Sequence, residues 1–299
     1  MISVNNIYKS FEKGKVQALK DISFEVKTGE LFGLIGPDGS GKTTLLRILT
    51  TVLLADKGQA SLNELDVVLD FKSIRSQVGY MPGKFSLYQD LSIEENLEFF
   101  AHVFNTSIEQ NYELIRDIYI QIEPFKKRRA GALSGGMKQK LALCCALIHR
   151  PKILILDEPT TGVDAVSRKE FWEMLKRLKA YGITIIVSTP YMDEADLCDR
   201  VALIQAGKIL SIGTPSAVAS SYSYPLYAIK SENMYPLLQN LRQIEGVHAV
   251  HPFGEYLHLT LEKNTDIGTI EKTLGQYNHK KLEIIPIKAN IEDVFMELM

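Results

Sequence analysis

A glycine-rich segment near the N-terminus carries residue types that bind a polyphosphate. Residues 36–44 are Gly-Pro-Asp-Gly-Ser-Gly-Lys-Thr-Thr and match the pattern G-x-x-x-x-G-K-[ST] of the phosphate-binding P-loop. The apolar run Leu31–Ile35 comes before it and predicts a buried strand, and 45–49 predict the first turns of a helix. A strand–loop–helix unit aims free backbone N–H groups and the positive end of a helix at one point. The sequence therefore predicts a nucleotide-binding site.

Each residue type in this segment suits contact with phosphate. Glycine allows the backbone to approach a phosphate closely, because a Cβ atom would block that approach. The Lys42 ammonium can reach the β- and γ-phosphates, and the Thr43 hydroxyl can hold Mg²⁺. The expected phosphate-binding residues are Gly36, Asp38, Gly39, Ser40, Gly41, Lys42, Thr43 and Thr44.

Two carboxylates follow another apolar run. Residues 153–156 are Ile-Leu-Ile-Leu, which is typical of a strand buried on both faces of a parallel sheet, and Asp157 and Glu158 come directly after them. The carboxyl end of such a strand faces the ligand crevice. We expect Asp157 to hold Mg²⁺ with Thr43, and Glu158 to polarise a water molecule aimed at the γ-phosphate. Glu158, Lys42 and Asp157 are the candidate catalytic residues.

Two weaker signals lie outside these segments. Phe11 precedes a turn at 12–15, and its ring either stacks on a nucleobase or fills the core. Ser134, Gly135 and Gly136 open a helical segment, so this turn either binds an anion at a helix N-terminus or only caps the helix.

The elements that must position these residues alternate along the chain. Residues 1–30 alternate apolar and polar side chains between turns, which predicts paired strands. Residues from about 84 to 150 show helical spacing, and an amphipathic helix at 167–178 precedes another buried strand at 183–188. Strands that alternate with helices predict an α/β fold with a doubly wound core.

The C-terminal part has a different organisation. A serine-rich stretch within 216–225 predicts a linker. Residues 226–299 then follow the order β-α-β-β-α-β and end in a helix, which predicts a small α+β, ferredoxin-like accessory domain. The element order does not give its role, and regulation and dimer contact are the two expected roles.

Composition excludes several classes of protein. The chain has 34 Lys and Arg residues against 36 Asp and Glu residues, a net charge of −2, so no basic field favours nucleic acid. Its three cysteines form no disulfide framework, which suits a reducing compartment. No apolar run approaches the ~20 residues that span a bilayer, and we expect a cytoplasmic protein.

Residues 1 to about 215 resemble the ATP-binding subunit of ATP-binding-cassette (ABC) transporters. The resemblance depends on the P-loop, Leu133–Gly136 and Leu156–Thr160 occurring together with family-like spacing. The segments Met137–Lys140 and Tyr191–Ala195 are most similar to the multidrug, ABC-2-type exporter branch. The resemblance implies a cassette at 1–215 with a parallel-sheet core, an antiparallel β subdomain and a helical subdomain at about 84–150.

The same resemblance implies partners and roles. In this family two cassettes dimerise head to tail, so Ser134, Gly135 and Gly136 would bind ATP held by the partner cassette. Phe11 would stack on adenine, and Gly162–Asp164 would cross the dimer interface. The subunit would bind ATP and Mg²⁺ and power a separate membrane permease, an exporter, at the inner face of the membrane, with Lys84–Tyr88 as the docking edge.

Two positions depart from the family pattern. Gly83 follows Tyr80-Met81-Pro82 where the family has Gln, and Pro190 follows Ser188-Thr189 where it has His. Both changes remove groups that sense the γ-phosphate, so we expect slow hydrolysis at this chain's own P-loop. A homodimer with compensating groups and an asymmetric heterodimer both remain open.

Two other functions compete with a transport ATPase. One is a nucleotide-gated regulatory subunit that binds but does not hydrolyse ATP, which the Gly83 and Pro190 pair keeps open. The other is a DNA-maintenance or translation ATPase, which would need a heptad insertion, a second cassette or a basic face. The sequence shows none of these features.

Overall fold

A computed structural model describes all 299 residues, 1–299. The chain forms two compact units, Met1–Ser216 together with Met299, and Ala217–Leu298. Each unit has its own hydrophobic core.

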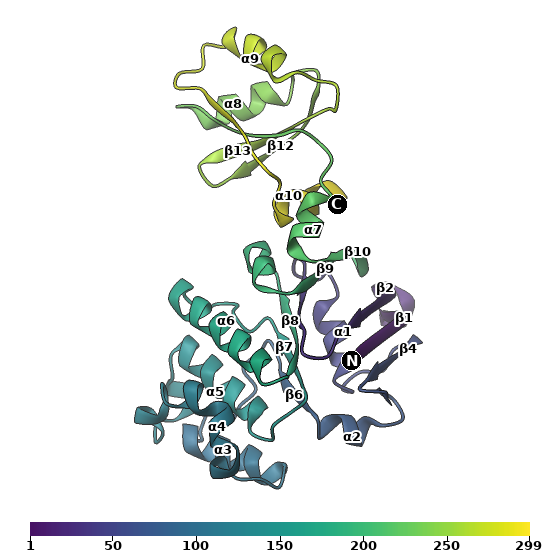
Figure 1. Ribbon diagram of the computed structural model, residues 1–299, viewed down its shortest axis with the longest axis vertical. Helices are drawn as coiled ribbons and strands as arrows, with labels where there is room; N and C mark the ends of the chain where they lie inside the picture. The colour runs from purple at the N-terminus through teal and green to yellow at the C-terminus, as the bar shows by residue number, and fades with distance from the viewer. The chain divides into compact units, whose positions relative to one another are not determined.

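A six-stranded sheet is the centre of the first unit (Figure 1), with strand order β10-β9-β3-β8-β7-β6. All neighbouring pairs are parallel except β9 with β10. Strands β3, β7 and β8 consist entirely of buried residues, as their apolar sequences predict. Because these strands run parallel, their carboxyl ends meet at one edge of the sheet. The strands are β3 Leu31–Ile35, β6 Val78–Met81, β7 Ile153–Asp157, β8 Thr184–Thr189, β9 Arg200–Gln205 and β10 Lys208–Gly213.

A second, four-stranded sheet has the order β2-β1-β4-β5 and is antiparallel throughout. Helix α1 (Lys42–Leu49) joins its core to that of the parallel sheet, because Leu45 and Ile48 belong to the same buried cluster as Ile22 of β2 and Ile155 of β7. This packing fixes the helix that follows the P-loop. The strands are β1 Ile2–Phe11, β2 Val16–Val26, β4 Lys57–Leu62 and β5 Leu65–Asp66, and the short helix α2 spans Phe71–Arg75.

The predicted helical region contains three helices, which Figure 1 shows gathered beside the parallel sheet. Ser92 begins the first of them with a capping box, in which its hydroxyl accepts a hydrogen bond from Glu95 N and the Glu95 carboxylate accepts one from Ser92 N. A longer helix, α6, connects β7 to β8 and buries Trp172 and Leu175. The helices are α3 Ile93–Val103, α4 Ile108–Tyr119, α5 Gly135–Leu147 and α6 Ala165–Ala180.

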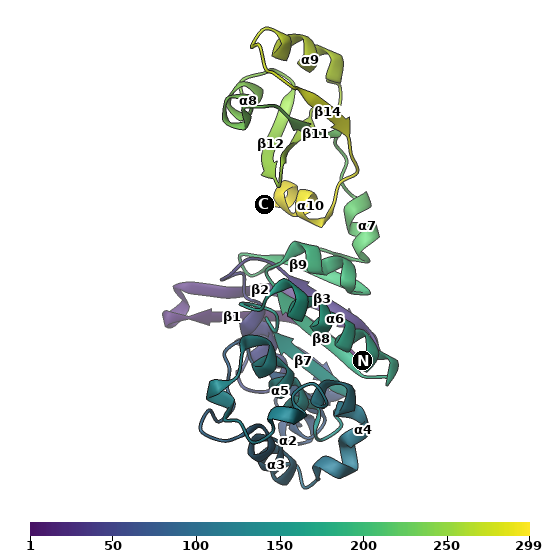
Figure 2. The same cartoon turned by 90° about the vertical axis from the view of Figure 1, so that its left-hand side faces the viewer.

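The second unit has the predicted β-α-β-β-α-β order and an antiparallel sheet, β12-β13-β11-β14 (Figure 2). Leu257 and Leu259 pack with α8 and α9 in one core, whereas His258, between them, bonds to Asp293 of α10. Since side chains alternate across a strand, α10 covers the opposite face. The elements are β11 Leu226–Lys230, α8 Met234–Leu241, β12 Val247–Phe253, β13 Tyr256–Leu261, α9 Ile267–Gly275, β14 Glu283–Pro286 and α10 Ile291–Leu298.

The predicted linker at 216–225 is only partly irregular. A short helix, α7 (Pro215–Ser220), occupies its first half. Proline is favoured at the first helical position, alanine favours helix at 217 and 219, and Val218 is buried. The sequence analysis predicted a linker because this stretch is rich in serine, and it missed this helix.

Candidate nucleotide-binding site

The P-loop connects the carboxyl end of β3 to the N-terminus of α1, as the sequence predicts. Gly41 is the N-cap of α1 with φ 109°, a left-handed conformation that favours glycine. A Cβ atom on Gly36 would lie 2.1 Å from the carbonyl oxygen of Ile204, so the loop passes against β9 where only glycine has room.

Lys42 is buried, and its ammonium lies inside the loop. The Nζ atom donates hydrogen bonds to the carbonyl oxygens of Gly36 at 2.7 Å and Pro37 at 3.0 Å. The same atom lies 3.1 Å from Oε1 of Glu158. The structure therefore brings together the P-loop lysine and the second carboxylate that follows β7.

Asp157 faces the P-loop from the end of β7. Its Oδ1 accepts hydrogen bonds from Thr43 Oγ1 at 3.1 Å and from Ser188 Oγ at 2.8 Å. Thr43 and Asp157 thus offer hydroxyl and carboxylate oxygen atoms at one point, and oxygen atoms are the ligands that Mg²⁺ prefers. These two residues fit the metal that the sequence assigns to them.

Ser188 belongs to this site although the sequence analysis did not select it. It lies opposite Asp157 in the parallel register of β7 and β8. Its hydroxyl oxygen also accepts a hydrogen bond from the backbone N–H of Glu158 at 3.0 Å. Glu158 has φ 50°, which is strained for a non-glycine residue, and this bond helps to hold it. The sequence signals for Ser188 are its position at the end of a buried strand and its place in the Ser188-Thr189 segment of the family pattern.

A cavity of about 270 Å³ lies over the P-loop. Gly39, Gly41, Lys42, Thr43, Thr44 and Glu158 line it, and so do residues of β2 that the sequence did not indicate. Those additional residues are Val16, Gln17, Ala18 and Lys20, together with Ala206. Lys20 adds a second cation beside the loop.

Phe11 lies at the end of β1 and pairs with Val16, which lines the P-loop cavity. The residue is 40% exposed, and Lys9 Nζ is 5.7 Å from the centroid of its ring. Of the two readings that the sequence left open, a core phenylalanine does not agree with this exposure.

Ser134, Gly135 and Gly136 do not line the P-loop cavity of their own chain. Ser134 is the N-cap of α5, and its hydroxyl accepts a hydrogen bond from Met137 N at 3.4 Å. Gly136 packs closely on α6, because a Cβ atom there would lie 2.8 Å from Ser167 Oγ.

The two unusual positions, Gly83 and Pro190, lie near different acidic residues. A Cβ atom on Gly83 would lie 3.0 Å from the carbonyl oxygen of Asp157. Pro190 follows Thr189, whose hydroxyl bonds to the buried carboxylate of Glu194. Glu194 also accepts a hydrogen bond from Thr160 Oγ1 at 2.9 Å, so it connects the segments after β7 and β8. The sequence analysis included Glu194 in the exporter-like segment Tyr191–Ala195 but gave it no role of its own.

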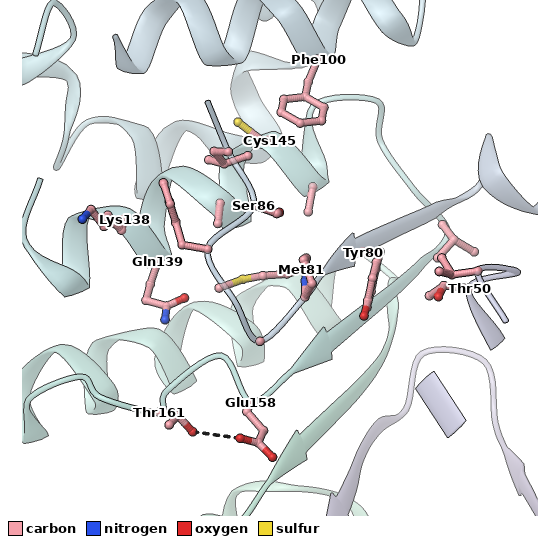
Figure 3. A pocket seen from close by; sticks show the side chains of 18 of the residues that line it. Thr50, Tyr80, Met81, Ser86, Phe100, Lys138, Gln139, Cys145, Glu158 and Thr161 are labelled. Carbon is pink, nitrogen blue, oxygen red and sulfur yellow. Dashed lines mark hydrogen bonds between the residues drawn. The ribbon is translucent and has the colours of Figure 1, made fainter. Parts of the chain in front are cut away.

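A larger cavity of about 670 Å³ begins at Gly83 and Glu158 and extends between the parallel sheet and the helical region (Figure 3). His149 lies in its wall, stacked on Phe104 with ring centroids 3.8 Å apart, and burial lowers the pKa of His149 to about 4. The lining is mostly apolar and includes Met81, Phe85, Leu87, Phe100, Val103 and Phe104.

None of the helices combines the length and the apolar composition needed to cross a bilayer.

Comparisons with known proteins agree with this geometry. Residues 19–161 match the family model described as ABC transporter. The chain is 35% identical over 303 residues to the probable multidrug ABC transporter ATP-binding protein YbhF of Escherichia coli (strain K12), covering 100% of this chain and 52% of the relative. The chain thus spans about half the length of that relative.

A second relative is of similar length. The Nod factor export ATP-binding protein I of Rhizobium sp. (strain N33) is 37% identical over 301 residues, which cover 99% of this chain and 96% of the relative. Among solved structures, one that aligns is the dimeric ATP-binding cassette MJ0796 in a post-hydrolysis state bound to ADP and Pi. Its TM-score is 0.65 and its sequence identity is 25%, and the alignment covers 72% of this chain and 98% of that chain.

The predicted fold is confirmed by the solved cassettes, and the predicted family by the relatives. The chain belongs to the ABC transporter family and has the fold of its ATP-binding cassettes.

Proposed function

We propose that this chain is the ATP-hydrolysing subunit that drives a separate membrane permease of the exporter type. One observation carries the proposal: Lys42 and Thr43 at the start of α1 contact Glu158 and Asp157 at the end of β7. A cation, a hydroxyl and two carboxylates then meet beside backbone amides at a helix N-terminus, which suits phosphoryl transfer to water.

Each of these residues has a distinct task in hydrolysis. Lys42 neutralises charge on the β- and γ-phosphates, and the loop amides orient the chain of phosphates. Thr43 and Asp157 would hold Mg²⁺, which screens the phosphate oxygens when it is bound. Glu158 accepts a proton from the water that attacks the γ-phosphorus, as the bond from that phosphorus to the ADP oxygen breaks. Ser188 holds Asp157 in place for this task.

Dimerisation would complete the site. Ser134, Gly135 and Gly136 are exposed or half-buried at the N-terminus of α5 and lie outside their own chain's P-loop cavity, so they are free to reach ATP on a second cassette. Phe11 is exposed enough to stack on adenine. The solved relative bound to ADP and Pi is a dimer, which supports this arrangement.

The permease would dock at the larger cavity. Its lining includes Phe85, Ser86 and Leu87 of the docking edge expected from the sequence, and it also reaches Glu158. A partner seated there would therefore touch the wall of the reaction centre. The relatives' names, a multidrug transporter protein and an export protein, support an exporter, and no observation favours a DNA-maintenance or regulatory protein. Bound to its permease, the subunit would lie at the cytoplasmic face of the membrane.

The test is magnesium-dependent ATP binding and turnover by the purified chain. We expect calorimetry to show MgATP binding that EDTA weakens and that Lys42→Ala abolishes. The proposal fails if ATP binds equally well without Mg²⁺, or if binding persists in the Lys42→Ala chain.

A further inference from the structure

A third cavity, of about 630 Å³, lies in the first unit at the edge of the parallel sheet opposite the P-loop. Lys152 lines it directly before β7 begins, and Thr184 lines it at the start of β8. The other ends of these strands carry Asp157 and Thr189. Five residues of strand span about 15 Å, so this cavity is separate from the nucleotide site.

The charge in this cavity is positive and uncompensated. Arg150 and Lys152 are both exposed, and neither forms a salt bridge. The one acid in the lining, Glu113, is paired with Arg116 at 3.1 Å. An anion entering the cavity would therefore meet two cations without displacing a carboxylate from either.

The backbone conformation of Arg150 does not favour arginine at this position. It follows α5 with φ 54°, and its N–H donates to the carbonyl oxygen of Leu147 at 2.8 Å. Glycine or asparagine adopts this left-handed conformation after a helix at lower cost than arginine. Arg150 therefore lines the cavity from a backbone conformation that arginine seldom adopts.

An aromatic surface lies in the same wall. Tyr181 follows the end of α6 and is 60% exposed, although its backbone N–H is fixed to Leu178 O at 3.1 Å. Polar side chains complete the lining, among them Asn111, whose Nδ2 donates to the carbonyl oxygen of Ile148 at 2.7 Å. An exposed phenol ring beside two cations suits a planar aromatic group that carries phosphate.

We propose that this cavity binds a small aromatic phosphate of nucleotide size. Arg150 and Lys152 bind its phosphate, and Tyr181 stacks on its ring. The one carboxylate in the lining, Glu113, is paired with Arg116, and the two cations supply the charge that the phosphate needs, so this binding needs no Mg²⁺. It is an additional site, distinct from the ATP site of the proposed function.

Binding of AMP to the full chain in EDTA tests the proposal, with inorganic pyrophosphate as the second probe. We expect calorimetry to show AMP binding that Lys42→Ala leaves unchanged and that the double variant Arg150→Gln/Lys152→Gln weakens at least about tenfold, because two charge-assisted contacts are lost. Tyr181→Ala should weaken AMP about tenfold and leave pyrophosphate unchanged. Lys208→Gln, which removes an exposed and unpaired cation of β10, is the matched control.

Two results would overturn the assignment. AMP binding that disappears in Lys42→Ala would place the ligand on the P-loop. AMP binding equal in the parent and in the Arg150→Gln/Lys152→Gln chain would show that the cavity binds no phosphate. Circular dichroism melts of every variant check that the fold is kept, and Lys152→Gln alone replaces the double variant if that chain unfolds.

Discussion

The ammonium of Lys42 lies 3.1 Å from the carboxylate of Glu158, so the residue proposed to bind phosphate also neutralises the residue proposed to accept the water proton. A nucleotide that draws Lys42 toward its phosphates would release Glu158. The two residues lie 116 positions apart in the chain, and only the placement of β7 beside the P-loop brings them together.

The first prediction concerns Glu158→Gln. Removing this carboxylate should lower ATP turnover about 10²- to 10⁴-fold, the usual contribution of a positioned base. MgATP affinity should stay the same or rise, because Lys42 loses a competing partner. Turnover and calorimetry measure the two effects, and Glu173→Gln on the exposed face of α6 is the control. Equal turnover in Glu158→Gln and the parent chain would exclude Glu158 as the base.

A second prediction concerns Ser188, which the structure adds to the site. Ser188→Ala removes one hydrogen bond to Asp157 and one from Glu158 N. Turnover should fall about ten- to hundredfold, since a hydrogen bond to a charged group is worth roughly 1.5–3 kcal/mol. Half-maximal activity should also need more Mg²⁺. Ser211→Ala, at a half-buried serine of β10, should change neither quantity. A magnesium requirement that does not move would contradict a role for Ser188 in holding Asp157.

The third prediction concerns Gly83 and Pro190, the two positions that depart from the family pattern. Gly83→Gln/Pro190→His should raise turnover of the purified chain on the order of 10²-fold, the scale of one preorganised donor. A Cβ atom on Gly83 would lie 3.0 Å from Asp157 O. The single variant Gly83→Ala therefore measures how much turnover is lost to this crowding alone. A parent chain that already matches the double variant would refute the slow-site hypothesis.

The fourth prediction is that the free energy of unfolding depends on pH through His149. Its pKa is lowered from 6.5 to about 4 by burial, so between these values the unfolded chain binds a proton that the folded chain does not. Stability should therefore fall as the pH drops through this window, by about 1–3 kcal/mol. His149→Phe keeps a ring to stack on Phe104 and removes the titration. Urea unfolding at pH 7.5 and 4.5 should show a smaller difference for the variant, and an equal difference would contradict the assignment.

The fifth prediction concerns the C-terminal helix α10. Asp293 accepts hydrogen bonds from His258 Nδ1 at 2.6 Å and Asn290 N at 2.9 Å. Asp293→Ala leaves a buried imidazole unpaired and should destabilise α10 by about 1–3 kcal/mol. Hydrogen exchange of the α10 amides should speed up accordingly. The exposed neighbour change Glu292→Ala should leave exchange nearly unchanged, and similar exchange in both variants would show that the pair does not hold the helix.

The sequence predicted most of the scaffold because its signals are local. The P-loop glycines, the buried strands β3 and β7, and the β-α-β-β-α-β order of residues 226–299 follow from propensity and spacing within a few residues. Helix α7 was missed, because the serines that suggest a linker outweighed the proline that begins the helix.

By itself, then, the sequence determined that Lys42 and Thr43 open a helix after a loop with the P-loop pattern and that Asp157 and Glu158 lie at the end of a buried strand. Only the tertiary structure placed Ser188 against Asp157, Glu194 between Thr160 and Thr189, and Arg150 beside Tyr181 at the far edge of the sheet. The physical reason is that parallel strands pair across long crossovers, and their register depends on packing between helices and sheet rather than on any short stretch of residues.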